Sequence, residues 1–372
     1  MIDTVVLTLN QDQFKILDYD RFTPSARGLF EPPFYKLGKS GIIRCHNNPS
    51  KKSHRYLPKL TLIKRMADGG CNLSMRVEFS LPKLVYGNNF AEIDPQNLPN
   101  LNTLFDSKSL EIMGVSFALP LEKTSVSAVH FCKNIILPKH ITSSMVINEI
   151  GKVSLTKRLD LNKTDFRNDG HAVKFHANSY EVAFYDKIQD LKQSCISEKR
   201  SIETDNHWQQ GLFKTLPKDL QVLRMEVRLN TRRKIKSLCE RLGQRVPETL
   251  SDVFRKDLAQ GVLLHFWNLI EHELNVVSMT RQKPENLFQQ LVTHVGMKPT
   301  KALQIIGWLA LINSVGMRGL NSMMGKSGQR AWVRLKKEIE NYPLTQVLNI
   351  EICKKIRESL IDFIPIMINN TT

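Results

Sequence analysis

Stretches in which apolar and polar residues alternate run through the first 230 residues and predict an antiparallel sheet. The expected strands are residues 2–9, 59–64, 72–80, 124–134, a hairpin over 171–187, and 220–229. The segment A-D-G-G predicts a turn between the second and third strands, because glycine supplies the positive φ that such connections need. Helices are expected over residues 97–113 and 138–150, in a short segment that ends at Gly87, and from the hairpin to about residue 200.

From residue 231 to residue 372 the apolar spacing is helical throughout. The sequence therefore predicts an α+β fold, in which a central antiparallel sheet flanked by helices occupies residues 1–230. An all-helical C-terminal domain over residues 231–372 would follow it, with a role in DNA binding or an accessory role.

A helix over residues 298–315, a break at Gly316 and a helix over residues 329–339 have the spacing of a helix-turn-helix motif. Such a motif would place three basic residues on DNA: Lys326, Arg330 and Arg334. Generic helix packing with a basic outer face explains the same pattern equally well. Trp308 and Trp332 are expected in the core.

The net charge of the chain indicates what kind of partner it binds. Among 372 residues, 53 Lys and Arg against 36 Asp and Glu give a net charge of +17, and the excess is spread along the chain. A distributed basic surface favours a polyanionic partner, most commonly nucleic acid. The longest apolar run, residues 302–312, is too short to span a membrane, and the first ten residues carry Asp3 without a basic leader. We therefore expect a cytoplasmic protein with no membrane partner.

Six cysteines lie far apart without a C-x-x-C pair. This pattern is typical of reduced, mostly buried thiols and argues against a zinc ribbon or a disulfide framework.

Strand alternation gathers chemically active side chains on the non-core faces of four expected strands. They are Arg76 and Glu78 on the third strand, His130 on the fourth, Tyr185 and Lys187 at the end of the hairpin, and Arg224, Glu226 and Arg228 on the last strand. Each has an ordinary structural explanation. A strand tyrosine is commonly a half-buried aromatic, a lone histidine is usually a hydrogen-bonded structural residue, and alternating Arg and Glu form cross-strand ion pairs.

Together, however, these residues suit phosphodiester chemistry. Two carboxylates and an imidazole, Glu78, His130 and Glu226, can hold a hard divalent cation such as Mg²⁺ or Mn²⁺. Tyr185 would then attack the phosphate in line and leave a 5′-phosphotyrosine and a free 3′-hydroxyl, while Lys187 lowers the pKa of the tyrosine or balances charge. Arg76, Arg224 and Arg228 are expected to contact DNA.

Four segments also resemble a known family: M-I-D, V-E-F-S-L-P-K-L-V-Y-G-N-N-F, E-V-A-F-Y-D-K-I and L-R-M-E-V-R-L-N. In order and spacing, over about 230 residues, they look like the gene II and gene X replication initiators of filamentous phages and related plasmids. The resemblance implies a rolling-circle initiator that nicks one strand of a supercoiled origin through Tyr185 and later rejoins it, with Glu226 as the most secure acidic position. It implies double-stranded origin DNA, its nicked strand, and a host helicase and polymerase as partners, in the cytoplasm of a bacterial host.

Two other functions remain open on the sequence. A non-catalytic origin- or operator-binding regulator would use the same basic surface, but it would need neither Tyr185 nor the strand carboxylates. A conjugative relaxase is a third possibility, although the chain shows no clear histidine triad and no appended helicase. Tyr180 is either a second nucleophile for rejoining or an aromatic residue at the hairpin edge.

Overall fold

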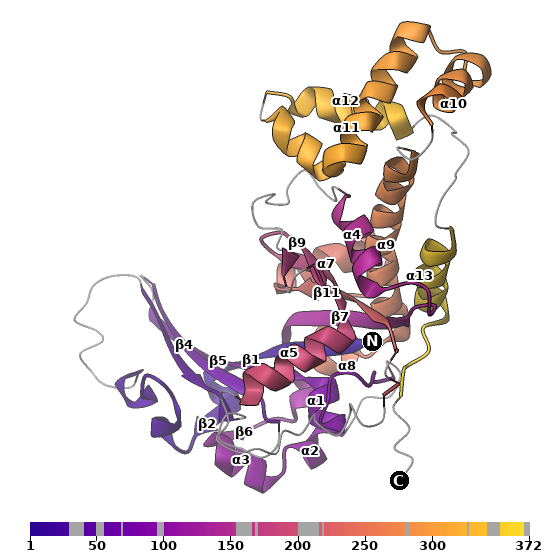
Figure 1. Ribbon diagram of the computed structural model, residues 1–372. Coiled ribbons are helices and arrows are strands. Elements are labelled where there is room, and N and C mark those ends of the chain that lie inside the picture. Colours follow the sequence, from indigo (N-terminus) through magenta and orange to yellow (C-terminus); the bar gives the residue numbers. More distant parts are fainter. Residues whose placement is uncertain are drawn as a thin grey trace.

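A computed structural model describes most of the chain (Figure 1). The described residues are 1–29, 41–49, 56–67, 70–94, 100–153, 166–167, 170–199, 216–217, 219–279, 283–325, 327–340 and 350–367. The fold is α+β, with an antiparallel sheet, flanking helices and a helical C-terminal region, as the sequence predicted.

One nine-stranded sheet organises the molecule. Its strands are β1 (Ile2–Asn10), β3 (Gly41–Asn47), β4 (Lys59–Ala67), β5 (Gly70–Ser80), β7 (Val126–Ile136), β8 (Phe166–Arg167), β9 (Ala172–His176), β10 (Tyr180–Asp186) and β11 (Val222–Leu229). They lie in the order β3-β4-β5-β1-β7-β11-β10-β9-β8, and every neighbouring pair is antiparallel. A separate pair is formed by β2 (Phe14–Ile16) and β6 (Val115–Phe117). The predicted strands are therefore confirmed. The sequence did not predict β2, β6 and β8, which are only two or three residues long, or β3, which the turn-rich composition of its segment concealed.

Helices connect and cover the sheet. They are α1 (Leu81–Tyr86), α2 (Leu101–Leu104), α3 (Ser107–Met113), α4 (Ser143–Gly151), α5 (Lys187–Lys199), α7 (Arg232–Arg241), α8 (Leu250–Val253), α9 (Lys256–Met279), α10 (Pro284–Gln289), α11 (Pro299–Met324), α12 (Gln329–Glu340) and α13 (Ile350–Asp362). Short 3₁₀ turns occur at η1 (Gln11–Gln13), η2 (Tyr19–Arg21), η3 (Ala26–Leu29) and η6 (Leu121–Lys123), and η8 (Gln290–His294) is a π-helix. The helix expected over residues 97–113 divides into α2 and α3, because the Asp106 side chain accepts a hydrogen bond from the Ser109 N–H and starts a new helix.

The two faces of the sheet differ in what covers them. On the core face, Phe184 of β10 lies 6.4 Å, ring to ring, from the fully buried Trp267 of α9. Phe79 of β5 meets Phe105 edge to face at 5.8 Å. On the opposite face, Leu191 of α5 forms a small cluster with residues of β11 and of segment 88–92. This second face carries the polar residues singled out by the sequence.

The predicted boundary at residue 230 does not divide the hydrophobic core. One continuous cluster of buried apolar residues extends from Met1 to Phe363, and α7, α9 and α13 all pack against β7. Among the described residues, the part of the chain from α10 to α12 projects beyond the end of α9, away from the sheet (Figure 1). The sequence predicted these elements as helices, but helical spacing does not say which surface an apolar face will cover.

The predicted break at Gly316 is confirmed, with φ of +74° inside α11. The N–H of Met317 donates to the carbonyl of Lys152, at the end of α4, over 3.0 Å. Trp332 is buried and Trp308 is partly buried against the core, as predicted.

Contrary to the sequence expectation, α11 is long and apolar enough by composition to cross a membrane, with 33% of the apolar window buried. Core helices of soluble proteins meet the same criterion of length and composition.

Two glycines that end helices offer a matched stability test. Gly87 after α1 and Gly114 after α3 both have φ near +70°, but only Gly114 is crowded, since an added Cβ would lie 2.9 Å from Cγ of Arg21. We expect Gly87→Ala to cost about 1–2 kcal/mol of unfolding free energy from its backbone conformation alone. Gly114→Ala should cost at least about 1 kcal/mol more because its neighbours must also move. Urea unfolding measures both, and equal losses would contradict the packing argument.

Candidate metal centre

The strand register aligns the polar residues in rows across the non-core face. One row runs His130, Arg228, Glu181 and His176 across β7, β11, β10 and β9. The next contains Cys132, Glu226, Ala183 and Lys174, and a third contains Asn134, Arg224, Tyr185 and Ala172. The prediction that Arg224, Glu226 and Arg228 share a face with Tyr185 is therefore confirmed. Ala183, which pairs with Glu226, has the smallest side chain of its row, and the Tyr185 hydroxyl reaches Glu226 from the neighbouring row.

Asp3 joins this face through an irregularity in β1. Ile2 pairs with Phe131 and Val5 with Val129, so three residue steps on β1 match two on β7. The extra residue is a β-bulge, and it turns Asp3 to the side of His130, whereas strict alternation would send it to the core with Val5. The start of the chain is held on β7 next to this bulge, because the Met1 amino group donates a hydrogen bond to the Cys132 carbonyl over 2.7 Å.

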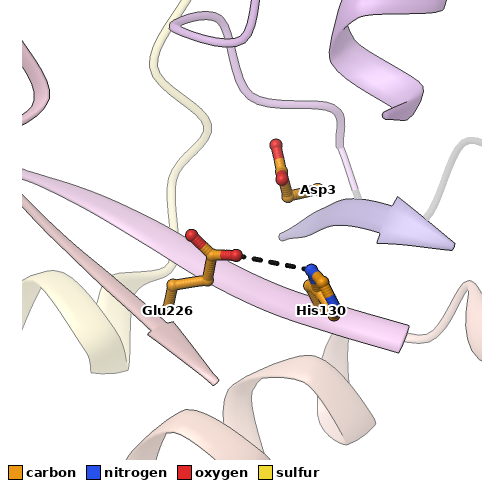
Figure 2. A group of neighbouring side chains, drawn as sticks. All are labelled: Asp3, His130 and Glu226. Carbon is orange, nitrogen blue, oxygen red and sulfur yellow. Dashed lines mark ion pairs between the residues drawn. The ribbon is translucent and has the colours of Figure 1, made fainter. Parts of the chain in front are cut away.

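Asp3, His130 and Glu226 form a group that can hold a metal ion (Figure 2). Each offers one ligand atom, and these atoms all lie within 4.8 Å of one another. Asp3 and Glu226 are buried, and His130 is partly exposed. Two carboxylates and an imidazole are ligands for a hard or borderline divalent cation.

Glu226 is the centre of the polar network. Its Oε1 accepts a hydrogen bond from Nε of Arg228 at 2.8 Å and lies 3.5 Å from Nδ1 of His130, while its Oε2 accepts from the Tyr185 hydroxyl at 2.7 Å. Burial favours the neutral acid, but the charge of Arg228 and the contacts with His130 hold the pKa of Glu226 well below its ordinary value. Glu226 is therefore a carboxylate at neutral pH and accepts hydrogen bonds from both sides.

Tyr185 is half-buried, and its hydroxyl is bound as a donor. Burial raises the pKa of Tyr185 well above its ordinary value; Arg224 opposes this shift and the Glu226 carboxylate adds to it. The phenol therefore keeps its proton in the resting protein. Attack by its oxygen requires a neighbouring group that takes the proton, and Glu226 is in position to do so.

Lys187 does not occupy the predicted place. The strand ends at Asp186 and Lys187 begins α5, so strand alternation no longer applies to it. It is fully buried, its ammonium pairs with Asp190 at 2.8 Å and lies 5.7 Å from the centre of the Tyr185 ring, and burial lowers its pKa. Lys187 contributes a charge near the ring but makes no hydrogen bond to the hydroxyl.

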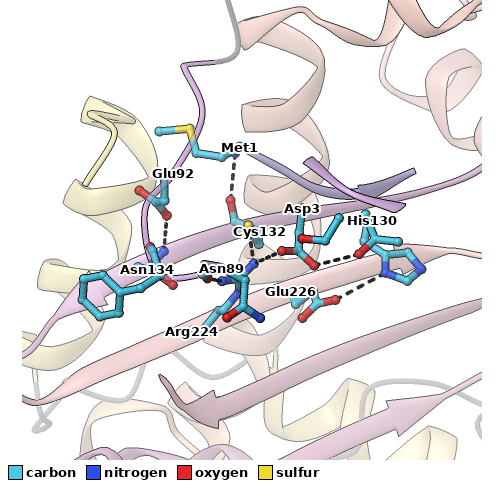
Figure 3. A network of polar contacts seen from close by, with 12 residues as sticks. Met1, Asp3, Asn89, Glu92, His130, Cys132, Asn134, Arg224 and Glu226 are labelled. Carbon is cyan, nitrogen blue, oxygen red and sulfur yellow. Dashed lines mark hydrogen bonds and ion pairs between the residues drawn. The ribbon is translucent and has the colours of Figure 1, made fainter. Parts of the chain in front are cut away.

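Arg224 was predicted to contact DNA, and the structure corrects this. It is 1% exposed, because α5 and segment 88–92 cover its end of the face. Its guanidinium pairs with Oδ1 of Asp3 at 2.7 Å and donates to the Asn89 carbonyl at 2.6 Å (Figure 3). It also donates to Sγ of Cys132 at 3.0 Å. Arg224 therefore balances the charge of Asp3 and links the site to segment 88–92.

The other predicted residues lie in several places. Glu78 faces Val6 of β1 and is outside the metal-binding group, since β5 and β7 are separated by β1 and lie roughly 10 Å apart. Asp3, from the intervening strand, takes the place assigned to Glu78. Arg228 is partly exposed and bridges Glu226 to Glu181, whose Oε1 lies 2.9 Å from Nη1 of Arg228.

The remaining predicted site residues do not belong to the metal-binding group. Arg76 is partly exposed on β5, and Arg330 and Arg334 are exposed on α12, whereas Lys326 lies outside the described residues. Tyr180 points to the core face, where its ring meets Phe266 at 5.3 Å and the Lys234 ammonium lies 4.1 Å from the ring centre. Tyr180 is therefore on the opposite face from Tyr185.

No family model, curated protein or solved structure matches the chain. The candidate metal centre accordingly rests on the geometry of the chain itself. Asp3 is the residue that strand alternation missed, and the only signal for it was its place in the M-I-D segment.

Metal affinity separates the predicted ligand set from the observed group. We expect Asp3→Asn to weaken Mn²⁺ binding at least about tenfold, since second-shell changes alone have effects of this size and this change removes a charged ligand. Glu78→Gln should leave the affinity unchanged. Calorimetric titration or electron paramagnetic resonance of Mn²⁺ measures both variants. Weakening by Glu78→Gln without weakening by Asp3→Asn would favour the ligand set drawn from the sequence.

Proposed function

We propose that the chain is a metal-dependent DNA nicking and joining enzyme that initiates rolling-circle replication. The observation that carries the proposal is the 2.7 Å hydrogen bond from the Tyr185 hydroxyl to Glu226, a member of the group that can hold a metal ion. A nucleophile, its proton acceptor and a candidate metal site thus meet on one sheet face. The resemblance to the gene II and gene X initiators supports the same assignment.

The residues of the group fit Mg²⁺ or Mn²⁺. Asp3 and Glu226 supply carboxylate oxygens and His130 supplies a ring nitrogen, and the partial exposure of His130 leaves one side of the group accessible. The cation, when bound, would withdraw negative charge from the phosphate oxygens and so lower the repulsion met by the nucleophile.

The chain's own residues would carry out the proton and bond changes. Oε2 of Glu226 orients the Tyr185 hydroxyl and takes its proton as the phenolic oxygen bonds to phosphorus. The bond between phosphorus and the 3′-oxygen breaks, and that oxygen takes a proton from water. The product is a 5′-phosphotyrosine and a free 3′-hydroxyl. Attack by a 3′-hydroxyl on the phosphotyrosine reverses these changes and rejoins the strand.

The partners follow from the same proposal. A net charge of +17 and the exposed Arg330 and Arg334 support a DNA partner, which we propose to be a double-stranded origin and its nicked strand. A host polymerase would extend the free 3′-end in the bacterial cytoplasm, together with a host helicase.

One observation favours the second candidate, a non-catalytic DNA-binding regulator. The carboxylates of Asp3, Glu226 and Glu181 are already paired with the guanidinium groups of Arg224 and Arg228. The buried charges therefore balance largely within the protein, and such a network can serve structure alone.

Covalent adduct formation decides between the two candidates. The purified protein is incubated with supercoiled DNA from the element that encodes it, in Mg²⁺ or Mn²⁺, and the products are separated under denaturing conditions. We expect nicked DNA linked to protein, with the nucleotide on the peptide that contains Tyr185, and no adduct in a chelator. Tight binding to DNA that contains the origin, without nicking, would reject the enzyme and support the regulator.

A further inference from the structure

The edge of the sheet formed by β3, β4 and β5 carries a second polar surface, which we call the basic edge. In Figure 1, β4 and β5 extend to the side of the molecule that faces away from α4, α7 and α9. Cys45, Leu62 and Met75 are buried on their core face. The alternate residues of each strand therefore lie on the face that also carries Asp3, His130 and Glu226.

Positive charge dominates the basic edge. Arg44 of β3 and Lys59 and Arg65 of β4 are exposed, and Arg76 of β5 is partly exposed. In the part of the chain that the structure describes, none of these four side chains forms an ion pair. Glu78 is the only carboxylate among the described residues of this face on the three strands. The four cations therefore keep their charge available to a partner.

The neutral residues between the cations suit phosphate oxygens. Thr61, Ser74 and Asn72 lie on the same face, paired in register with Arg76, Ile63 and Arg65 respectively. Hydroxyl and amide groups join Arg and Lys in contacts to DNA phosphates. A protein-binding surface would instead be expected to have an apolar, aromatic centre, and Ile42 is the one large apolar residue exposed here among the described residues.

The basic edge is continuous with the proposed active site. Glu78 of β5 pairs with Val6 of β1, and Val6 pairs with Ala128 of β7, two residues from His130. Strands lie about 4.8 Å apart, so Arg76 stands roughly 10 Å, and Arg44 roughly 20 Å, to the side of β7. At about 3.4 Å per base pair, this corresponds to about three to six base pairs from a phosphate bound at His130.

We propose that the basic edge binds the sugar-phosphate backbone of the DNA duplex that flanks the cleaved bond. The cations would contact phosphates about three to six nucleotides from that bond and contribute affinity rather than sequence reading. The position of the contacts relative to the nick rests on the proposed function, but binding to the duplex does not require cleavage.

The salt dependence of DNA binding tests the basic edge. Affinity for a duplex of about 30 base pairs is measured without metal, in a Tyr185→Phe background, so that no cleavage occurs. We expect Arg44→Gln with Arg65→Gln to reduce the slope of log affinity against log salt by about 1.8, since each phosphate that a cation neutralises contributes about 0.9. Lys108→Gln with Lys123→Gln removes the same charge from exposed residues of α3 and η6, and should leave the slope unchanged.

The possible outcomes separate the alternatives. An unchanged slope in the Arg44 and Arg65 variant, or an equal reduction in the lysine control, would overturn the assignment. Equal binding of an RNA duplex of the same sequence, with the same reduction of slope, would overturn the choice of DNA and indicate a general polyanion surface.

The place of the basic edge relative to the nick needs a second measurement. Phosphate ethylation interference on the parent protein should mark phosphates about three to six nucleotides from the nick. The marks about four to six nucleotides away should be absent in the Arg44 and Arg65 variant, because β4 and β3 lie three and four strands from β7. The nearest marks, opposite Arg76, should remain. Persistence of the distant marks in the variant would overturn the assignment. A reduced slope without any covalent adduct in the cleavage assay would reject the proposed enzyme and leave the basic edge supported.

Discussion

Tyr185→Phe is expected to remove the covalent DNA product and to lower strand cleavage at least about 10³-fold, since losing a nucleophile has effects of this size or larger in well-studied enzymes. The phenyl ring keeps its place on β10, and only the oxygen that would bond to phosphorus is lost. Quantifying the protein-linked DNA on a denaturing gel, with enzyme in excess over the supercoiled substrate, measures the effect on the chemical step.

Tyr180→Phe is the matched control, on the same strand and on the opposite face. Its ring packs against Phe266 in the core, away from Glu226. Removing its hydroxyl should therefore change cleavage by no more than about twofold, provided that circular dichroism shows both variants folded. An adduct that persists in the Tyr185 variant and disappears in the Tyr180 variant would reverse the assignment of the nucleophile.

Glu92→Gln is expected to give the largest loss of stability. Glu92 is 1% exposed, and its Oε2 accepts from the Lys133 ammonium at 2.6 Å and from the Ile366 N–H at 3.0 Å, while Oε1 accepts from the Asn134 N–H at 2.5 Å. The substitution leaves the buried Lys133 charge without its partner, which typically costs about 3–5 kcal/mol. Denaturant unfolding followed by circular dichroism measures the change in the free energy of unfolding.

Glu358→Gln provides the exposed counterpart. Glu358 pairs with Lys354 at 3.8 Å one turn away on α13, where both side chains face solvent. Such pairs contribute less than about 0.5 kcal/mol, so this variant should unfold almost as the parent does. A loss below about 1 kcal/mol in the Glu92 variant would show that the buried network is not a major source of stability.

The sequence predicted the sheet well because its signal is local. Alternation in the segment that carries Met225 and Glu226 states which side chains share a face, whatever the neighbouring strands are. The same local argument placed Tyr185 on the face of Glu226, and the register then brought their oxygens together. The pattern could not predict whether that face is exposed to solvent, because α5 and segment 88–92 pack over part of it.

Asp3 shows the limit of the same argument. A single extra residue in β1 reverses which side of the sheet Asp3 faces, and a bulge of this kind leaves little trace in the apolar pattern. Glu78 was predicted as a ligand because it satisfies alternation, yet it is two strands from His130. Strand order, which depends on contacts between distant parts of the chain, decides between these two carboxylates.

The packing of α13 has a consequence for synthesis of the protein. Ile356, Leu360 and Phe363 are buried in the same core as β1, and α13 packs against β7 and α9. A nascent chain that has emerged only as far as α12 therefore carries a complete set of strands whose apolar face is partly uncovered. Such intermediates are prone to aggregate. We infer that folding is completed only after translation has passed residue 363. Until then, the uncovered apolar face of the sheet must be kept from contact with other chains.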